Sequence, residues 1–543
     1  MLKKLFLLST ILACLNAEIA LHDINSKPSG RAKNFMIWQY LKQDITPLQA
    51  DAAYAQVEGD IAKIKREYLK KSNNEVLQKE IECRNEKDLL SIDEKDCLKL
   101  AMSPYKTLDL DDSSREELLK RLESDHAKNL VKIQAESYSE KAYKSYDAKT
   151  ILTMFTSSTK KHIQENLNID LSKDFINSIF SKDKSSWRKF SFIKKVVNND
   201  ELDKLQISLL LLNGEHVDSE SNFLLALNHL KFSRKSHAVK HFELAIKKAK
   251  RRMNADKNRF WIYLVTADKK YLNDLLLSMD INIYTLYAKD KLGKKVDNYF
   301  SSVEIVDEKS KKDICDPFVW NNIMEEIKDT PKSELLKLAN KYSQKNMSSV
   351  QSFIIEKAYG FKMHGYIMPY DEHLKDISND EKALVYALMR QESNLVPSAL
   401  SRSFALGLMQ LMPFVADDLS KRIKNPITCY DDMFKPSYNI KYALKHLEWM
   451  KKSLYHPLFT AYAYNGGMGF LRRHLQSGTF NKGKYEPFMS MELMSNRESR
   501  EYGKKVLSNY VMYKKILGED ISIVDLLNSL TDPKKTDRFR LKG

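Results

Sequence analysis

The sequence predicts a mainly α-helical protein in which a long solenoid of stacked helices precedes a domain richer in turns. Proline is absent between Pro104 and Pro317, and only Gly214 and Gly293 interrupt that stretch. Nine of the 15 glycines fall at or after Gly407. Because β-sheets need frequent turn residues, the first part must be nearly all helix. At most a small β element is expected, in the domain that follows.

The helical part is too long to share one compact core, so helix pairs that stack on their neighbours are the natural arrangement. Ala238, Phe242, Ala245 and Ala249 recur at helical spacing, which puts small residues at the packing positions of one helix. Arg259-Phe260-Trp261 begins the next expected helix. No strict repeat period is visible, so we describe the solenoid as degenerate.

Residues 1–17 have the features of a secretory signal peptide. Met1-Leu2-Lys3-Lys4 is basic, Leu5 to Leu15 is apolar, and Ala17 is a small residue suited to cleavage. The apolar run is too short for a stable anchor, and no later run is long enough to span a bilayer. The sequence therefore predicts an exported, periplasmic protein without a transmembrane anchor. Lipid attachment at Cys14, in a weak lipobox, is the minor alternative.

Export determines how the cysteines are interpreted. Four remain after cleavage, and four cysteines can pair in three ways. Cys83 and Cys97 flank a polar turn between two helical segments, which makes them the expected disulfide in an oxidising compartment. Cys315 and Cys429 are expected to be free, buried thiols. No cysteine has a neighbour at metal-ligand spacing, so neither a metal site nor a cofactor is predicted.

The net charge of +17 and the pI of about 9.2 indicate a basic protein. Solvated helix faces explain most of this charge. An exported chain without a recognition motif is a poor nucleic-acid binder, so an anionic cell-wall polymer is the better partner. Trp38, Tyr40 and Trp449 are candidates for stacking on sugars, although aromatic residues in helices usually belong to the core.

Glu392 is the candidate catalytic acid. Ser378-Asn379-Asp380-Glu381 forms a capping box, and apolar residues at helical spacing follow it as far as Leu395. Pro397 ends the helix near Asn394, which puts Glu392 in the last turn. The negative end of the helix dipole and partial burial both disfavour the ionised form, as a general acid requires. A lone glutamate would more often lie on a solvated helix face.

Several motifs accompany this acid between residues 365 and 515. They are Glu392-Ser393, the turn from Gly407 to Gln410, Ala463-Tyr464-Asn465, and a segment from Glu492 to Tyr502. Together they resemble the soluble, Slt-type lytic transglycosylases, whose catalytic domain is similar to goose-type lysozyme. Three positions depart from the family pattern, namely Leu406, Ser495 and Ser499.

The resemblance implies a peptidoglycan lytic transglycosylase that cleaves the MurNAc-β-1,4-GlcNAc bond without water and leaves 1,6-anhydro-MurNAc ends. Glu392 matches the single acid/base, and Ser401 matches a serine that hydrogen-bonds to that acid. Further residues match positions that bind the substrate: Met409, Gln410, Tyr464, Asn465, Glu492 and Tyr502. Glycan strands and muropeptides are the implied partners, with proteins of cell-wall synthesis or division as further candidates.

Other carboxylates in this part of the chain are weaker candidates for the same role. Asp417 and Asp418 are interpreted as a solvated helix face, and Glu498 as a structural residue paired with Arg500 or Arg472. Two other functions stay open: a hydrolytic, lysozyme-like muramidase, in which a second carboxylate activates water, and a non-catalytic cell-wall scaffold. Intact motifs argue against the scaffold.

The resemblance also suggests an architecture. A ring-shaped α-superhelix is expected over residues 18–310, a helical linker domain over 311–362, and the lysozyme-like catalytic domain over 363–543. The last domain is expected to fold alone, because it holds its own capped helices.

Overall fold

The computed structural model describes residues 18–541, which divide into two compact units: residues 74–278 form one, and residues up to 73 together with residues from 279 onward form the other. The predicted signal peptide and Cys14 lie outside the described residues and stay predictions. The domain boundaries expected near residues 310 and 362 also stay predictions.

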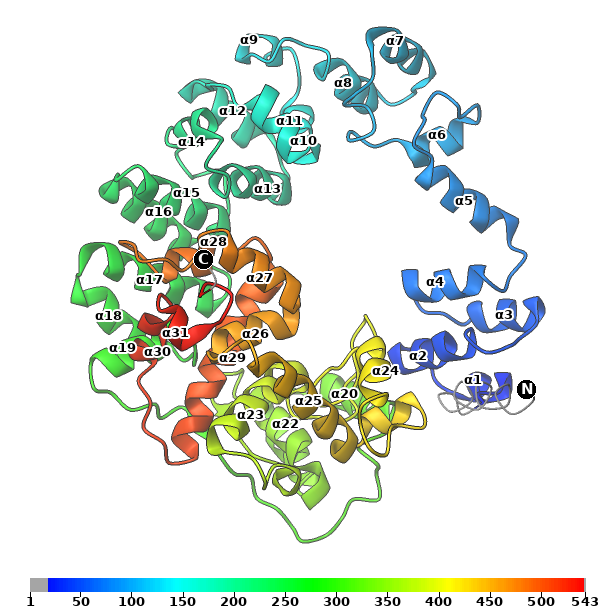
Figure 1. The fold of residues 1–543 in the computed structure, drawn as a ribbon, viewed down its shortest axis with the longest axis vertical. Coiled ribbons are helices and arrows are strands. Elements are labelled where there is room, and N and C mark those ends of the chain that lie inside the picture. The colour runs from blue at the N-terminus through cyan, green and yellow to red at the C-terminus, as the bar shows by residue number, and fades with distance from the viewer. Residues whose placement is uncertain (1–17, 542–543) are drawn as a thin grey trace, which may run out of the picture. The chain divides into compact units, whose positions relative to one another are not determined.

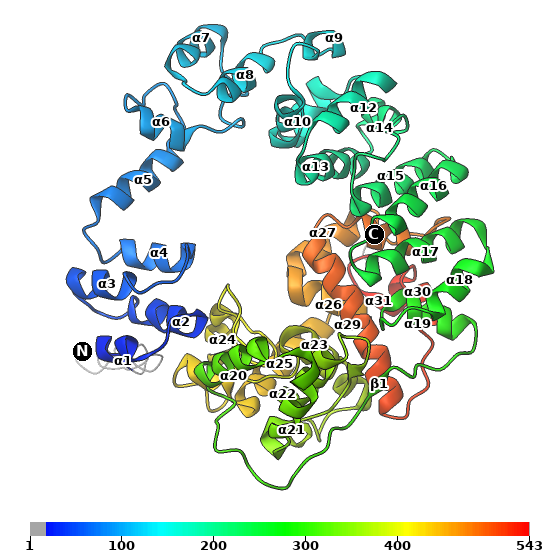
Figure 2. The ribbon, with the colours of Figure 1, turned by 180° about the vertical axis from the view of Figure 1, so that it is seen from behind.

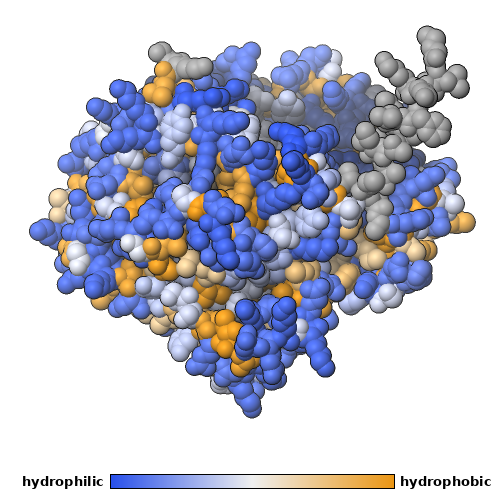
Figure 3. Space-filling view, turned by 60° about the horizontal axis from the view of Figure 1, so that its bottom comes forward, coloured by the Kyte–Doolittle hydropathy of each residue, from blue (hydrophilic) through white to orange (hydrophobic). Residues whose placement is uncertain are grey.

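The unit of residues 74–278 is built from short helices that pack on their sequence neighbours (Figure 1). The helices are α5 (Glu75–Asn85), α6 (Lys95–Ala101), α7 (Asp112–Arg121), α8 (Asp125–Ile133), α9 (Glu140–Tyr143), α10 (Ala148–Ser157), α11 (Lys160–His162), α12 (Lys173–Lys182), α13 (Ser186–Val197), α14 (Asp203–Leu209), α15 (Ser219–Lys231), α16 (Lys235–Lys247), α17 (Arg252–Thr266) and α18 (Lys269–Leu276). Figure 3 shows mostly hydrophilic residues on one face of the molecule, with hydrophobic residues in small groups.

Predicted packing positions lie in the core of this unit. Ala238, Phe242 and Ala245 of α16 are fully buried. The ring of Phe242 lies 5.8 Å from that of Phe223 on α15 and 5.9 Å from that of Trp261 on α17, so three consecutive helices share one aromatic contact. Cys83 and Cys97 join α5 to α6 through a disulfide with a Cα–Cα distance of 5.1 Å, which is the expected pair. Cys315 and Cys429 are free and partly buried.

The other unit holds the predicted catalytic motifs. Its elements are α1 (Leu21–Ser26), α2 (Arg31–Tyr40), α3 (Pro47–Tyr54), α4 (Ala62–Leu69), α19 (Ile283–Lys291), β1 (Tyr299–Phe300), α20 (Pro317–Asp329), α21 (Leu335–Lys341), α22 (Ser348–Ala358), β2 (His364–Gly365), α23 (Asn379–Ser393), α24 (Pro413–Ser420), α25 (Pro436–Lys451), α26 (Pro457–Gly466), α27 (Met468–Gln476), α28 (Phe488–Leu493), α29 (Arg497–Ile516), α30 (Ile523–Ser529) and α31 (Pro533–Thr536).

Helix α29 is the centre of this unit and packs against both α23 and α26, as Figures 1 and 2 show. Gly503 allows the close approach to α26, because a Cβ atom there would lie 2.3 Å from Cε1 of Tyr462. Strands β1 and β2 pair in parallel. The fold class is therefore mainly α-helical with a small β element, as predicted. Within residues 18–541, no helix combines the length and the apolar composition that crossing a membrane requires.

The first helices of the chain pack on the segment between Glu392 and the turn at Gly407. Phe35 and Trp38 on α2 pack on Phe404, with ring centroids 5.3 and 5.5 Å away. Arg31 Nη1 donates to the carbonyl of Leu400 over 2.7 Å. Trp38 is only 6% exposed, so it is a core residue and the prediction of sugar stacking there is wrong. The same correction applies to Tyr40, which is also buried.

Candidate active site

Helix α23 has the ends that the sequence predicts. The Ser378 hydroxyl accepts from the backbone N–H of Glu381, and the Glu381 carboxylate accepts from the backbone N–H of Ser378, both over 3.3 Å. At the other end Asn394 adopts a left-handed conformation, with φ of 51°, which stops the helix. Glu392 therefore occupies the last turn, near the negative end of the helix dipole.

Arg390, on the same turn, holds this helix end in place. Its Nε donates to the carbonyl of Gly365 over 2.8 Å, and its guanidinium lies 4.4 Å from the ring centre of Tyr366. It also forms a buried ion pair with Glu356 on α22. These contacts hold the end of α23, and with it Glu392, against α22 and β2.

The Glu392 carboxyl is partly buried and hydrogen-bonded to a tyrosine. Its pKa is raised to about 7, mainly by burial and to a smaller extent by the charge of Glu498. The Tyr502 hydroxyl donates to Glu392 Oε1 over 2.7 Å and lowers the pKa in part, because it stabilises the carboxylate. A carboxyl with a pKa near neutrality can both donate and accept a proton. Tyr502 is 6% exposed, so it positions the acid and shows little surface to a substrate.

Glu498 is the second carboxylate near the acid. Its Oε1 accepts from Nδ2 of Asn465 over 3.2 Å. The Oδ1 atom of Asn465 in turn accepts from the hydroxyl of Ser499 over 2.8 Å. The predicted pairing of Glu498 with an arginine is thus replaced by a bond from Asn465, and Glu498 belongs to the surroundings of Glu392.

The turn from Gly407 to Gln410 is held by hydrogen bonds from side chains to backbone carbonyls. Gly407 has φ of +74°, and a Cβ atom there would lie 2.2 Å from the carbonyl oxygen of Met433, so only glycine fits without a shift. Gln410 Nε2 donates to the carbonyls of Ala399 and Gly407 over 2.9 and 2.8 Å. The Tyr464 hydroxyl donates to the carbonyl of Met409 over 2.7 Å, which ties this turn to α26.

Asn439 on α25 organises the same turn, and sequence reasoning missed it. Its Oδ1 accepts from the backbone N–H of Met409 over 2.8 Å. Its Nδ2 donates to the carbonyls of Leu406 and Met433 over 2.9 and 2.8 Å. An asparagine within a helical pattern gives no signal of such a role, since its partners lie up to 33 residues away.

The structure gives Ser401 and Met409 roles that differ from those predicted. The Ser401 hydroxyl accepts from the backbone N–H groups of Ser403 and Ala405, over 3.2 and 2.9 Å. It therefore stabilises its own turn, while Tyr502 supplies the hydrogen bond to Glu392. The Met409 side chain is fully buried, so it is a core residue here and not an exposed wall for a sugar.

Glu492 is also buried, in an ionic cluster. Its carboxylate accepts from Nζ of Lys504 over 3.1 and 3.2 Å and from the hydroxyl of Tyr284 over 2.5 Å. Glu492 is 1% exposed and Lys504 is fully buried. The cluster links α28 and α29 to α19, so the prediction that Glu492 contacts a sugar gives way to a structural role. Removing one partner would leave an uncompensated buried charge.

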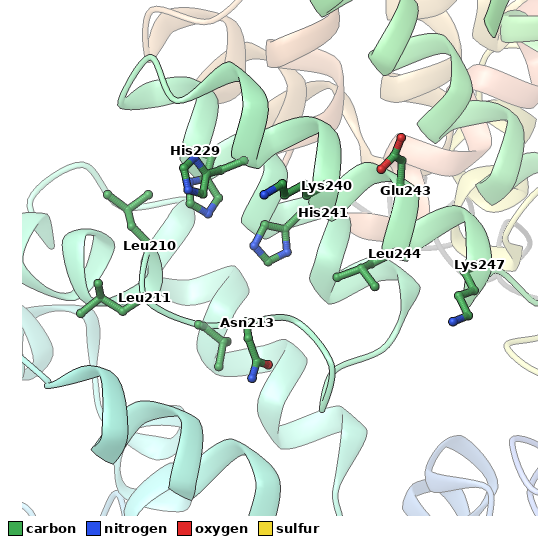
Figure 4. Close-up of a pocket in the computed structure, with 11 residues that line it drawn as sticks. Leu210, Leu211, Asn213, His229, Lys240, His241, Glu243, Leu244 and Lys247 are labelled. Atoms are coloured by element: carbon green, nitrogen blue, oxygen red, sulfur yellow. The ribbon is translucent and has the colours of Figure 1, made fainter.

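A separate cavity of ≈ 540 Å³ lies in the unit of residues 74–278, lined by leucine, lysine and histidine side chains (Figure 4). The rings of His229 and His241 stack with a centroid distance of 5.0 Å. Burial lowers the pKa of His229 to about 3 and that of His241 to about 4. Both imidazoles are neutral at physiological pH, and this cluster shares no residue with the surroundings of Glu392.

The fold and this site define a mainly helical protein that holds a partly buried carboxylic acid near Tyr464, whose hydroxyl bonds to a glycine turn. Residues 371–486 match the family described as the transglycosylase SLT domain, so this part of the chain is similar to that domain. The match includes Glu392, the glycine turn and Tyr464, which is where the sequence motifs resembled this family.

Two curated relatives align with this part of the chain. The soluble lytic murein transglycosylase of Escherichia coli (strain K12) is 26% identical over 208 residues, which are 37% of this chain and 31% of the relative. A putative soluble lytic murein transglycosylase of Haemophilus influenzae is 28% identical over 203 residues, which are 36% of this chain and 33% of the relative. The chain thus aligns with about a third of the length of these relatives.

Solved structures resemble the chain over a longer span. An inactive mutant of the lytic transglycosylase Slt from Pseudomonas aeruginosa has a TM-score of 0.50 at 16% identity, covering 93% of this chain and 84% of the other. The complex of a 70-kDa soluble lytic transglycosylase with bulgecin A has a TM-score of 0.50 at 14% identity, covering 93% and 89%. At such identities the likeness shows a common fold.

Proposed function

We propose that this chain is a peptidoglycan lytic transglycosylase that uses Glu392 as its single acid and base. The observation that carries the proposal is the partly buried Glu392 carboxyl, with a pKa of about 7 and a hydrogen bond from Tyr502. The transglycosylase SLT domain around it and the names of the aligned relatives support the same reaction and the same substrate class.

In the proposed reaction Glu392 first donates its proton to the oxygen between MurNAc and GlcNAc. Burial favours the protonated form that this step requires. The resulting carboxylate then removes the proton from the C6 hydroxyl of MurNAc, whose oxygen attacks C1 and closes a 1,6-anhydro ring. Tyr502 stabilises the carboxylate between the two steps, and the attack is intramolecular, so it needs no bound water.

A hydrolytic muramidase is the second candidate, because Glu498 is close enough to raise the pKa of Glu392. Glycosidases that use water need such a second carboxylate as base or nucleophile. Glu498 is exposed and hydrogen-bonded to Asn465, so a water held beside it could be activated.

Digestion of purified peptidoglycan in oxygen-18 water separates the two reactions. We expect products that end in 1,6-anhydro-MurNAc without heavy oxygen, and no products from Glu392→Gln. In Glu498→Gln the anhydro products should persist, since no water is activated. Reducing ends labelled with heavy oxygen, lost in Glu498→Gln, would establish hydrolysis instead, and full turnover by Glu392→Gln would refute both schemes.

We further propose that the protein acts outside the cytoplasm, in the periplasm. The murein substrate named for the relatives lies there, and a disulfide such as Cys83–Cys97 is typical of oxidising compartments. A partnership with proteins of cell-wall synthesis or division is part of this proposal.

A further inference from the structure

Trp449 is an exposed tryptophan on the helix that organises the glycine turn. It lies on α25, ten residues after Asn439, and is 46% exposed. Tryptophan is highly buried on average, so a half-exposed ring on a helix requires an explanation. The neighbouring residues Leu447 and Met450 are in the core, which shows that the helix itself is firmly packed.

The exposed ring is held in a defined orientation. His446, one turn earlier, stacks on it with a centroid distance of 5.6 Å and an interplanar angle of 25°. Burial lowers the pKa of His446, although the charge of Asp418 on α24 opposes this effect. The imidazole is therefore neutral near pH 7, and the two rings form a rigid, uncharged surface.

This surface continues into the candidate active site. The ring of His446 meets the ring of Tyr464 edge to face, with centroids 5.8 Å apart. The Tyr464 hydroxyl donates to the carbonyl of Met409, next to Gln410. The charge of Glu392 is near enough to help raise the pKa of this phenol. Trp449, His446 and Tyr464 thus form a continuous row of rings from the surface towards the acid, which we call the aromatic row.

We propose that the aromatic row is a binding subsite in which the Trp449 ring stacks on a sugar of the glycan strand away from the bond that is cut. The inference rests on the proposed function and adds to it the residue that holds the strand beyond Tyr464. A neutral pyranose ring has an apolar C–H face, which an uncharged indole face matches, and a fixed ring loses little entropy when it binds.

Binding measurements in the Glu392→Gln protein test the proposal, because this variant should leave the strand intact. The probe is a set of soluble glycan strands of alternating GlcNAc and MurNAc with defined lengths, titrated by calorimetry into the full-length protein. Trp449→Ala should raise Kd about tenfold, which corresponds to about 1.4 kcal/mol, and only for strands long enough to reach the row. Trp449→Phe should restore most of the affinity.

Trp187 provides the matched control, since it is exposed to 69% on α13 and belongs to the other unit. Trp187→Ala should bind every strand like its parent. A purely structural role for Trp449 would change melting temperature or affinity regardless of strand length. If Trp449→Ala folds poorly, the fluorescence of the parent gives a second readout: the emission change on strand binding should vanish in Trp449→Phe.

The outcomes separate the two proposals. Parental affinity of Trp449→Ala at every strand length, with binding by the parent intact, would overturn the subsite and leave Trp449 as a surface for a protein partner. If the parent binds no strand and the wild type releases no product from peptidoglycan, the proposed function fails and the subsite fails with it.

Discussion

Replacing Tyr502 by phenylalanine tests how the site sets the pKa of its acid. The change removes the hydroxyl that donates to Glu392 Oε1 over 2.7 Å and keeps the packed ring. A hydrogen bond to a charged group contributes about 1.5–3 kcal/mol, and one pKa unit corresponds to about 1.4 kcal/mol. Because the bond stabilises the carboxylate, its loss should raise the pKa of Glu392 by about one to two units above its value of about 7.

The pH dependence of kcat/KM reports this shift. Glu392 must be protonated to donate, so kcat/KM should fall as the pH rises through its pKa, near pH 7 in the wild type. In Tyr502→Phe this alkaline limb should move to higher pH, while the maximal rate drops because the intermediate carboxylate is less stabilised. Release of soluble muropeptides, followed between about pH 5 and 9, measures both effects.

Glu498→Gln supplies a control of opposite sign. It removes a negative charge that raises the pKa of Glu392, so the limb should move to lower pH. The shift should be smaller, and smaller again at high salt, because Glu498 is exposed and its field is screened. An alkaline limb that stays in place or moves down in Tyr502→Phe would refute the assignment of Glu392 as the acid that Tyr502 holds.

Further predictions concern stability. Glu392→Gln should raise the free energy of unfolding by about 3 kcal/mol above pH 7 and by little near pH 5. The reason is that the folded carboxyl has a pKa of about 7 instead of 4.5, so the wild type loses stability as the pH rises between these values. Equal shifts of the melting temperature at both pH values would contradict this. Gly407→Ala should lower the free energy of unfolding, measured with denaturant, more than Gly518→Ala does. Both glycines have a positive φ, but only at Gly407 would the added Cβ clash with the carbonyl of Met433. Phe35→Ala should lower the free energy of unfolding by about 3–5 kcal/mol and should also lower kcat. Wild-type activity with a lowered melting temperature would show that Phe35 contributes to packing and not to catalysis.

Local features of the site could be predicted from the sequence. The capping box at Ser378 predicts the start of α23, and the position of Asn394 before Pro397 predicts its end, because both signals act within a few residues. The same holds for the turn at Gly407, which the glycine predicts and the positive φ of +74° confirms. Helix content followed equally from the scarcity of proline and glycine.

Side-chain partners across the fold could not be predicted in the same way. Tyr502 bonds to Glu392 across 110 residues and Tyr284 bonds to Glu492 across 208 residues, so no local pattern encodes either contact. Burial decides the outcome in each case. The motifs identify Glu492 and Met409 as candidate site residues. Whether they face solvent depends on the packing of helices around them, and both are buried.

The contact of α2 with the glycine-turn region makes the intervening polypeptide a tether. Residues 18–73 and 279–541 belong to one compact unit, and residues 74–278 connect the two parts covalently. A proteolytic cut of that tether outside the loop closed by the Cys83–Cys97 disulfide would convert the docking of Phe35 and Trp38 on Phe404 from an intramolecular contact into a bimolecular one. The effective concentration that the covalent connection gives to α2 would be lost. Dilution of the cut protein should then expose Phe404 and abolish the proposed activity, although Glu392 and Tyr502 are intact.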